Sequence, residues 1–317
     1  MMRERVACVF GASGFVGRHV VQRLAAAGWR VRAAVRDPES AAFLRPMGDP
    51  GQVVPFRGDL NDPASVRAAV AGADVVVNLV GILYERGRQT FQNIHVAGAA
   101  AVAKAAAEAG AKTLVHVSAL GASASSPSRY ARSKAAGEEA VRAAFPAAVI
   151  LRPSVIFGAE DDFFNRFARL ASFSPVLPVI GRRGGTLMQP VFVGDVADAV
   201  LAAVRSPTAA GHTYSLGGPA TYRFADILRL VLAATGFRDL LVPLPLSLAR
   251  TQAFFLALLP KPPLTPDQVT LLATDNVVPA GAPGLADLGI AATAVEAVVP
   301  GYLKRYASRR AAGAQAA

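Results

Sequence analysis

The stretch that decides the fold is VACVFGASGFVGRHVVQRLAAAGWRVRAAVR, residues Val6 to Arg36. It begins with a short apolar run, as expected of a strand buried on both faces of a parallel sheet. Gly11, Gly14 and Gly17 follow at the spacing G-x-x-G-x-x-G. The first glycine permits a tight turn, the second lets a pyrophosphate approach the backbone, and the third lets the next helix pack on its strand. We therefore predict a dinucleotide-binding loop.

The residues around the glycines give this loop the context it requires. Apolar residues from Val20 to Leu24 have helical spacing, Gly28 ends the helix, and a second apolar strand follows at residues 31–35. The alternative is an ordinary strand–turn–helix whose glycines serve packing only. The residues predicted to contact the dinucleotide here are Gly11, Ser13, Gly14, Phe15, Val16, Gly17 and Arg18.

The end of the second strand bears on cofactor choice. An NAD site usually has Asp or Glu there to bind the ribose hydroxyls, but this chain has Arg36 followed by Asp37. Arginine can hold a 2′-phosphate through its planar guanidinium, and Arg18 could add charge. The pattern favours NADP(H) over NAD. Asp37 could still serve the ribose of NAD, and both arginines could instead be solvated surface charges.

Length and composition indicate an ordinary folded protein. With 317 residues and 53% hydrophobic composition, we expect a nucleotide-binding domain over 1–157, a smaller and mostly helical domain over 158–305, and a flexible basic tail over 306–317. The single cysteine, Cys8, lies in the first strand, where we interpret it as a small core residue in a reducing compartment. The four histidines show no metal-binding spacing, so no metal site is predicted.

The net charge of +11 suggests attraction to an anionic partner, although a basic solvated surface is the alternative. No Lys/Arg run with interleaved aromatic residues marks a nucleic-acid face. The N-terminus lacks the pattern of a secretory signal, and no apolar run reaches the ~18 residues needed to span a bilayer. We therefore expect the chain to stay on the cytoplasmic side of the membrane.

Apolar strands are expected next at residues 52–56, 74–79, 113–118 and 147–151, with helices between them, including one over 91–110. This alternation predicts an α/β fold with a doubly wound parallel sheet. Ligands bind such sheets at the carboxyl ends of the strands. The candidate cofactor contacts at these ends are Asp59, which could bond the adenine, Leu60, Leu79, Val80 and Gly81.

A candidate catalytic group follows the fifth strand. Ser118 precedes the run SRYARSK, in which Tyr130 and Lys134 are four residues apart and so share one face of a helix. A lysine ammonium beside a phenol favours the phenolate and lowers the tyrosine pKa, which would make Tyr130 an acid or base near neutral pH. Ser118 would hydrogen-bond a substrate oxygen.

The segments GASGFVG and YARSK, with Ser118 between them, resemble the short-chain dehydrogenase/reductase superfamily, in its extended or atypical branch. The resemblance implies that Tyr130 is the acid/base, that Lys134 holds the nicotinamide ribose, and that the backbone of Pro153, Ser154 and Val155 meets the nicotinamide amide. One departure is His95, which stands where the family often has an asparagine that supports a proton relay. Asn93 lies nearby on a different face.

The C-terminal half narrows the resemblance. The segments GAEDDFFNRFARLASFSPVLPVIG, QPVFVGDVADAV and PLTPDQVTLLATDNVV are similar to the NADPH-holding accessory subunits of respiratory complex I and their bacterial relatives. This implies tightly held NADPH without turnover, a structural, assembly or regulatory role on the peripheral arm, and a peripheral position on the cytoplasmic face of a bacterial inner membrane. The alternatives are an active NADP-dependent reductase, dehydratase or sugar-nucleotide epimerase, and a nucleotide-sensing module with another partner.

Three features of this half also have simple structural interpretations. Phe163, Phe164 and Phe167 have helical spacing and are expected to pack the smaller domain. Asp195 is expected to cap a helix over 196–204. A helix over 247–259 is apolar on nearly every side, so it must be buried in the fold, in a partner or in lipid. We expect burial within the fold, with docking on a membrane complex as the alternative.

Overall fold

The computed structural model describes residues 5–181, 184–238, 240–260 and 262–307. The chain forms two compact units, and it passes between them several times. The first unit runs to Pro153 and adds Gly194–Leu216 and Gly281–Ile290; the second contains Ser154–Val193, Gly217–Ala280 and the chain from Ala291 onward. Most of the predicted basic tail, with Arg309 and Arg310, lies outside the described residues, as does Lys261.

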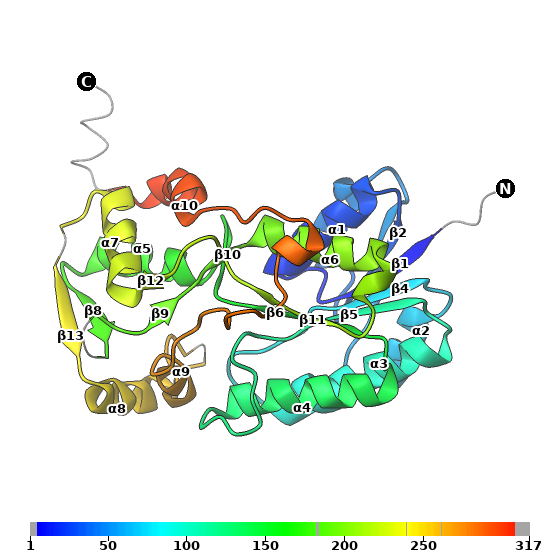
Figure 1. The fold of residues 1–317 in the computed structure, drawn as a ribbon, viewed down its shortest axis with the longest axis horizontal. Helices are drawn as coiled ribbons and strands as arrows, with labels where there is room; N and C mark the ends of the chain where they lie inside the picture. The colour runs from blue at the N-terminus through cyan, green and yellow to red at the C-terminus, as the bar shows by residue number, and fades with distance from the viewer. Residues whose placement is uncertain (1–4, 182–183, 239, 261, 308–317) are drawn as a thin grey trace. The chain divides into compact units, whose positions relative to one another are not determined.

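A seven-stranded sheet forms the centre of the first unit, with strand order β11-β6-β5-β4-β1-β2-β3 and every pair parallel (Figure 1). Its strands are β1 (Val6–Phe10), β2 (Arg30–Val35), β3 (Val53–Arg57), β4 (Val75–Asn78), β5 (Thr113–Val117), β6 (Val149–Pro153) and β11 (Thr213–Leu216). The central pairing sets Phe10 beside Ala34 on one side and beside Asn78 on the other. The predicted doubly wound parallel sheet is confirmed.

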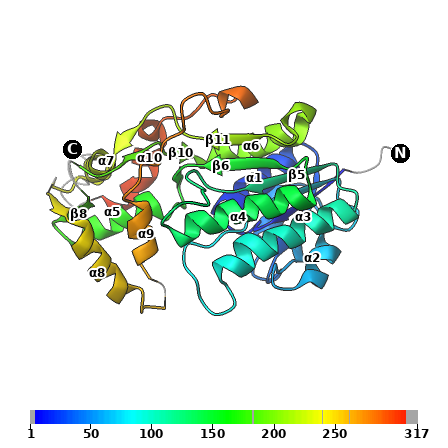
Figure 2. The ribbon, with the colours of Figure 1, turned by 60° about the horizontal axis from the view of Figure 1, so that its bottom comes forward.

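Helices cover both faces of this sheet. On one face lie α1 (Phe15–Ala26) and α6 (Val193–Arg205), where Arg23 and Asp198 form an ion pair of 2.6 Å. On the other lie α2 (Pro63–Val70), α3 (Ala99–Glu108) and α4 (Arg129–Ala144), which run side by side in Figure 2. Cys8 is fully buried in β1, as predicted. The helix expected over 91–110 instead begins with a π-helical segment, η2 (Gln92–Gly98), which sequence periodicity did not reveal.

The second unit is mostly helical. Three of its helices, α5 (Phe163–Phe173), α7 (Phe224–Thr235) and α10 (Val295–Leu303), surround a core rich in aromatic side chains. The rings of Phe163 and Phe167 lie 5.3 Å apart edge to face, so the prediction that these phenylalanines pack the smaller domain is confirmed. Short strands pair as β7 (Ile156–Phe157) with β10 (Val191–Phe192), β8 (Leu177–Ile180) with β13 (Leu241–Leu244), and β9 (Leu187–Met188) with β12 (Tyr222–Arg223). Short 3₁₀ turns are η5 (Lys304–Tyr306) in this unit and η1 (Ala42–Met47), η3 (Pro207–Ala209) and η4 (Ala286–Leu288) in the first unit.

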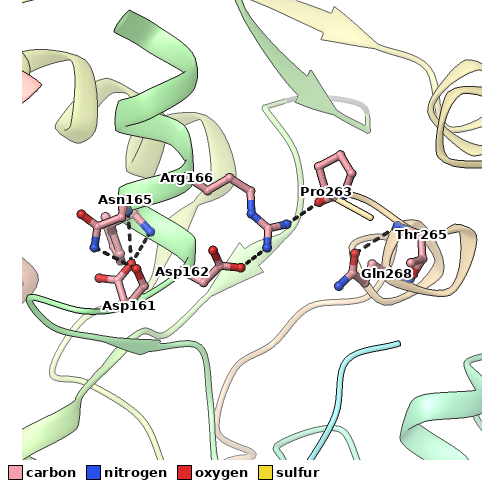
Figure 3. A network of polar contacts seen from close by, with 8 residues as sticks. Asp161, Asp162, Asn165, Arg166, Pro263, Thr265 and Gln268 are labelled. Atoms are coloured by element: carbon pink, nitrogen blue, oxygen red, sulfur yellow. Dashed lines mark hydrogen bonds and ion pairs between the residues drawn. The ribbon is translucent and has the colours of Figure 1, made fainter. Parts of the chain in front are cut away.

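The start of α5 is held by a buried carboxylate. The Asp161 side chain accepts hydrogen bonds from the backbone N–H groups of Phe164 and Asn165 (Figure 3). From the same helix, Arg166 pairs with Asp162 and donates to the carbonyl of Pro263, in the loop before α9 (Pro266–Leu271). The α5 helix therefore anchors the end of the segment that contains α8 (Leu246–Leu256).

Two predictions for this half were wrong. Asp195 lies inside the first turn of α6, because that helix begins at Val193, before the aspartate, and not after it. The α8 helix buries only Ala249 and Ala253, whereas Phe254 and Phe255 are 61% and 63% exposed. The fully buried residues of α8 are small, and Leu248, Phe254 and Phe255 are exposed, so burial within the fold does not explain its composition. Among the described residues, every helix is too short or too polar to cross a bilayer.

Candidate functional site

The glycine loop has the geometry that its spacing predicted. Gly11 adopts a φ of +78° and donates its N–H to Ala34, while Gly14 forms the N-cap of α1 without any side chain of its own. A Cβ added to Gly17 would lie 2.1 Å from the Gly11 carbonyl oxygen. The backbone of the loop therefore contacts the backbone of α1, and no side chain would fit at position 17. The first N–H groups of such a helix have no intrahelical partners and are free to meet an anion.

The rest of the predicted loop contacts surround this helix start. Ser13, Phe15 and Val16 are half-buried, and the Arg18 guanidinium reaches back to the carbonyl of Ser13 and lies 5.4 Å from the ring centre of Phe43. Arg18 thus has a defined position beside the loop.

The two charged residues after β2 differ in what they contact. Asp37 uses its carboxylate within its own turn, where it accepts hydrogen bonds from the N–H groups of Glu39 and Ser40. Arg36 is exposed, and within the described part of the chain it has no ion-pair or hydrogen-bond partner. The guanidinium is therefore available to a ligand, whereas one carboxylate oxygen of Asp37 is engaged in its own turn.

The next two strand ends carry the other predicted contacts. After β3, Asp59 is half-buried and accepts hydrogen bonds from the backbone and side chain of Asn61, and Leu60 is buried. Capping of α2 falls to Asp62, which accepts from the first-turn N–H groups. After β4, Leu79 and Val80 are half-buried.

Gly81 follows as an exposed residue. A Cβ on Gly81 would lie 3.7 Å from His95 Nε2 and 3.9 Å from Lys134 Nζ. This strand end therefore lies directly against the candidate catalytic lysine.

The structure brings the predicted serine, tyrosine and lysine to the carboxyl end of β5. Lys134 is buried in α4 and donates from Nζ to the carbonyl of Val117, which immediately precedes Ser118. Tyr130 lies one turn earlier on α4, with its ring centre 5.4 Å from that of His95. The Ser118 hydroxyl is buried and has no hydrogen-bond partner within the described chain. An orphaned buried hydroxyl at a strand end is typical of a ligand site.

The electrostatics of this group differ from the prediction. Burial raises the pKa of Tyr130 to about 12, and no lowering by Lys134 offsets it. Burial also lowers the pKa of Lys134 to about 8, partly countered by the carboxylate of Glu138. The expected low tyrosine pKa is thus wrong for the protein alone, because burial removes the phenolate from water.

The neighbours of His95 in space were not predicted. His95 lies in η2, is 1% exposed, and makes hydrogen bonds through both ring nitrogens, to Ile82 and to Ser133. Burial, followed by the charge of Lys134, lowers its pKa to about 3. Asn93 is exposed on the other side of η2 and bonds the carbonyl of Arg88, so it does not approach the site.

Sequence reasoning missed a second buried pair beneath the site. Asn78, at the end of β4, accepts from the N–H of Val80 and donates to His116 Nδ1 on β5, at 3.2 Å. Burial lowers the pKa of His116 well below its usual value. A polar residue inside each of two apolar strands was the signal that could have revealed this pair.

Three predicted contacts fall where the chain passes from the first unit to the second. Pro153 ends β6 in the first unit, where its carbonyl accepts from Leu120. Ser154 and Val155 open the second unit, where the Ser154 hydroxyl bonds the side chain of Asn276. Their predicted contact with a nicotinamide amide stays a prediction.

The residues of the first unit fit a nicotinamide dinucleotide. The side-chain-free N-cap at Gly14 fits a pyrophosphate, and the unpartnered Ser118 hydroxyl fits a polar group beyond it. This arrangement and the sheet topology define a class of nucleotide-binding α/β protein.

Comparison with known proteins identifies the class more closely. The family described as NAD dependent epimerase/dehydratase matches residues 7–217. The chain belongs to this family, which confirms the predicted resemblance to the extended short-chain dehydrogenases. The UDP-glucose 4-epimerase of Thermus thermophilus, solved with NAD, has the same fold, with a TM-score of 0.71, 19% identity, and coverage of 95% of this chain and 98% of the epimerase.

Relatives with higher identity extend through the second unit. The chain is 38% identical to the mouse mitochondrial protein named NADH dehydrogenase [ubiquinone] 1 alpha subcomplex subunit 9, over 96% of this chain and 81% of that protein. The Arabidopsis thaliana protein of the same name is 40% identical over 95% and 76%. A protein named ceramide reductase from Caulobacter vibrioides is 37% identical over 76% of this chain and 74% of its own length.

Proposed function

We propose that this protein is an accessory subunit of respiratory complex I that holds NADP(H) without turning it over and has a structural, assembly or regulatory role. The observation that carries the proposal is the similarity to subunits named for NADH:ubiquinone oxidoreductase over nearly the whole chain, second unit included. Similarity of fold alone explains less, because the epimerase with the same fold is only 19% identical over 95% of this chain.

The state of the candidate catalytic group supports retention without turnover. A phenol with a pKa of about 12 does not readily give up its proton near neutral pH. When bound, the nicotinamide supplies hydride chemistry. Tyr130 and Lys134 would then serve to orient and hold the nucleotide, with Ser118 offering a hydrogen bond.

The choice of NADP(H) rests on the two residues after β2. Arg36 is exposed and unengaged within the described chain, while Asp37 has its carboxylate in a local turn. The 2′-phosphate would thus meet a cation. We expect Arg36→Ala to weaken NADPH binding about tenfold or more, from the loss of a charge-assisted hydrogen bond, and to leave NADH binding nearly unchanged. Arg67→Ala, which removes an exposed arginine from α2, is the matched control.

The proposed position is peripheral, on an anionic membrane surface at the cytoplasmic face of a bacterial inner membrane. The exposed Phe254, Phe255 and Leu258 on and after α8 support it, because large apolar side chains held at the surface favour a lipid interface. Residues 240–266 contain Arg250 and Lys261 and no acidic residue, so their charge complements anionic lipid.

The experiment that tests the assembly role is a pull-down of the tagged protein from membranes in mild detergent, with mass spectrometry of its partners and assay of released nucleotide. Complex I subunits with stoichiometric NADPH are expected. If the tagged protein is recovered from the membrane without those subunits, the proposal is contradicted.

Membrane contact is tested separately by sedimentation with anionic and with neutral vesicles. We expect binding to anionic vesicles that falls sharply in the double variant Phe254→Ser/Phe255→Ser. Leu83→Ser, at a 50% exposed apolar residue of the first unit, is the control that should leave binding intact. Equal binding by both variants contradicts a role for α8.

The second candidate is an active NADP-dependent reductase, epimerase or dehydratase. It is favoured by the complete Ser118, Tyr130 and Lys134 group and by the relative named a ceramide reductase. Oxidation of NADPH by the purified wild-type chain with a carbonyl compound, lost in Tyr130→Phe, would establish it in place of the first.

A further inference from the structure

The starting observation is a chain of hydrogen bonds that links the end of β4 to α4 through a buried histidine. The backbone N–H of Ile82 lies 3.0 Å from His95 Nε2. His95 Nδ1 lies 2.8 Å from the hydroxyl of Ser133, and this hydroxyl donates to the carbonyl of Tyr130 at 2.7 Å. All of these residues belong to the first unit.

The donors and acceptors in this chain determine the histidine tautomer. A backbone amide can only donate, so His95 Nε2 must carry no proton. The Ser133 hydroxyl has its own proton directed to the Tyr130 carbonyl and is therefore the acceptor from His95. The imidazole is thus neutral with its proton on Nδ1, and every hydrogen bond runs in one direction from Ile82 to Tyr130.

The ring of His95 is packed between aromatic neighbours. The ring of Phe91 stacks on His95 at 5.3 Å with an interplanar angle of 21°, and Tyr130 contacts it edge-on. On its backbone side, the carbonyl of His95 lies so near α4 that a Cβ on Gly137 would be 2.1 Å from it. The π-helical turn and α4 are therefore in direct backbone contact.

We infer that His95, as the Nδ1–H tautomer, is a positioning residue that ties the backbone at Ile82 to α4 through Ser133 and so holds the Leu79–Gly81 segment against Lys134. The inference rests on the proposed function, in which this segment contacts the retained nucleotide. It assigns to His95 the retention of the ligand and not the transfer of a proton.

The same chain cannot carry protons out of the site. To accept a proton on Nε2, His95 would have to release the Ile82 amide, and the new cation would face the ammonium of Lys134. At its other end, the chain stops at a backbone carbonyl, which has no proton to pass on. His95 therefore closes this route between the site and α4.

The first test is the tautomer itself. In the purified full-length chain labelled with ¹⁵N-histidine, long-range ¹H–¹⁵N spectra distinguish a protonated Nδ1 from a protonated Nε2. We expect His95, assigned by its loss in His95→Gln, to show the Nδ1–H pattern and to remain neutral throughout the range from pH 8 to pH 5. A protonated Nε2, or a histidine that titrates near neutral pH, overturns the inference.

The second test is the rate at which bound NADPH dissociates, followed by fluorescence after dilution or chase. We expect His95→Gln to raise this rate about tenfold, and Ser133→Ala to raise it while altering the Nδ1 signal of His95, because a buried N–H then loses its acceptor. Asn93→Ala, in the same π-helical segment but on its exposed side, should leave the rate unchanged.

The outcomes separate this inference from the proposed function. If the wild-type chain binds no NADPH, the proposed function is contradicted, and the tautomer of His95 still tests the hydrogen-bond chain by itself. A chain that binds NADPH and loses it equally slowly in wild type, His95→Gln and Ser133→Ala overturns the positioning role. If His95→Gln fails to fold, the change that Ser133→Ala causes in the Nδ1 signal assigns His95, and the wild-type tautomer and the dissociation rate of Ser133→Ala then decide.

Discussion

Replacing Gly137 by alanine tests the contact on which the geometry of the site depends. Both glycine and alanine fit the helical backbone of α4, where alanine is intrinsically better by about 1 kcal/mol. The new methyl carbon, however, would lie 2.1 Å from the carbonyl oxygen of His95. To reach ordinary van der Waals separation, α4 and η2 would have to move apart by about 1 Å.

The expected cost follows from this displacement. Overpacking a tight interior contact costs about 1–3 kcal/mol, and a clash between a Cβ and backbone is at the upper end because neither atom can rotate away. After the gain in helix propensity, we expect Gly137→Ala to lower the free energy of unfolding by about 2 kcal/mol. The same displacement should speed NADPH dissociation, because His95 moves with its backbone.

The matched control is Gly301→Ala in α10. This glycine is also helical, but a Cβ there meets nothing within 4 Å. We expect it to raise the free energy of unfolding by up to about 1 kcal/mol. Urea unfolding followed by circular dichroism measures both variants. If Gly137→Ala proves as stable as Gly301→Ala, the close approach of η2 to α4 is refuted, and the reasoning about His95 fails with it.

Three further predictions concern ionisation and capping. Burial lowers the pKa of Lys134 from 10.5 to about 8, so between these pH values the unfolded chain binds a proton that the folded chain lacks. The free energy of unfolding of the wild type, relative to Lys134→Met, should therefore rise by about 2–3 kcal/mol from pH 8 to pH 10.5 and stay constant below pH 8. Urea unfolding at several pH values measures this difference. The phenol of Tyr130 should not ionise below about pH 11, and an absorbance difference between wild type and Tyr130→Phe near pH 9 would contradict its burial. Asp62→Ala should destabilise the first unit by about 1 kcal/mol through loss of the α2 cap, and Asp62→Asn should restore most of it in urea unfolding.

The exposed face of α8 shows where composition misleads. An apolar helix is compatible with burial in its own fold, in a partner or in lipid, and sequence contains no information on which surface it meets. In the structure, Ala249 and Ala253 pack against Ile180 and Val269, whereas Phe254 and Phe255 remain exposed. The packed side of α8 is identified by these two alanines, together with the half-buried Leu246.

The candidate site also contains features that the sequence predicted and features that it did not. The glycine loop was predictable because Gly11, Gly14 and Gly17 act through local geometry, and a parallel sheet necessarily brings strand ends together. The pKa of Tyr130 was not, since it depends on how much water the fold removes from the phenol. His95 could be placed in a helix from sequence, but its bonds to Ile82 and Ser133 join residues 13 and 38 positions away.

The sequence by itself determined the alternation of strands and helices in the first 153 residues and the nucleotide loop, because both are encoded in short-range spacing, and its segments carried the resemblance to the family. Only the tertiary structure decided that η2 is π-helical, that Asp195 lies within its helix, and that His95 is a neutral link between β4 and α4. These properties arise from close approach between distant segments, above all at Gly137. Local spacing specifies which elements form, and the contacts between them set the tautomers, pKa values and exposed faces on which function depends.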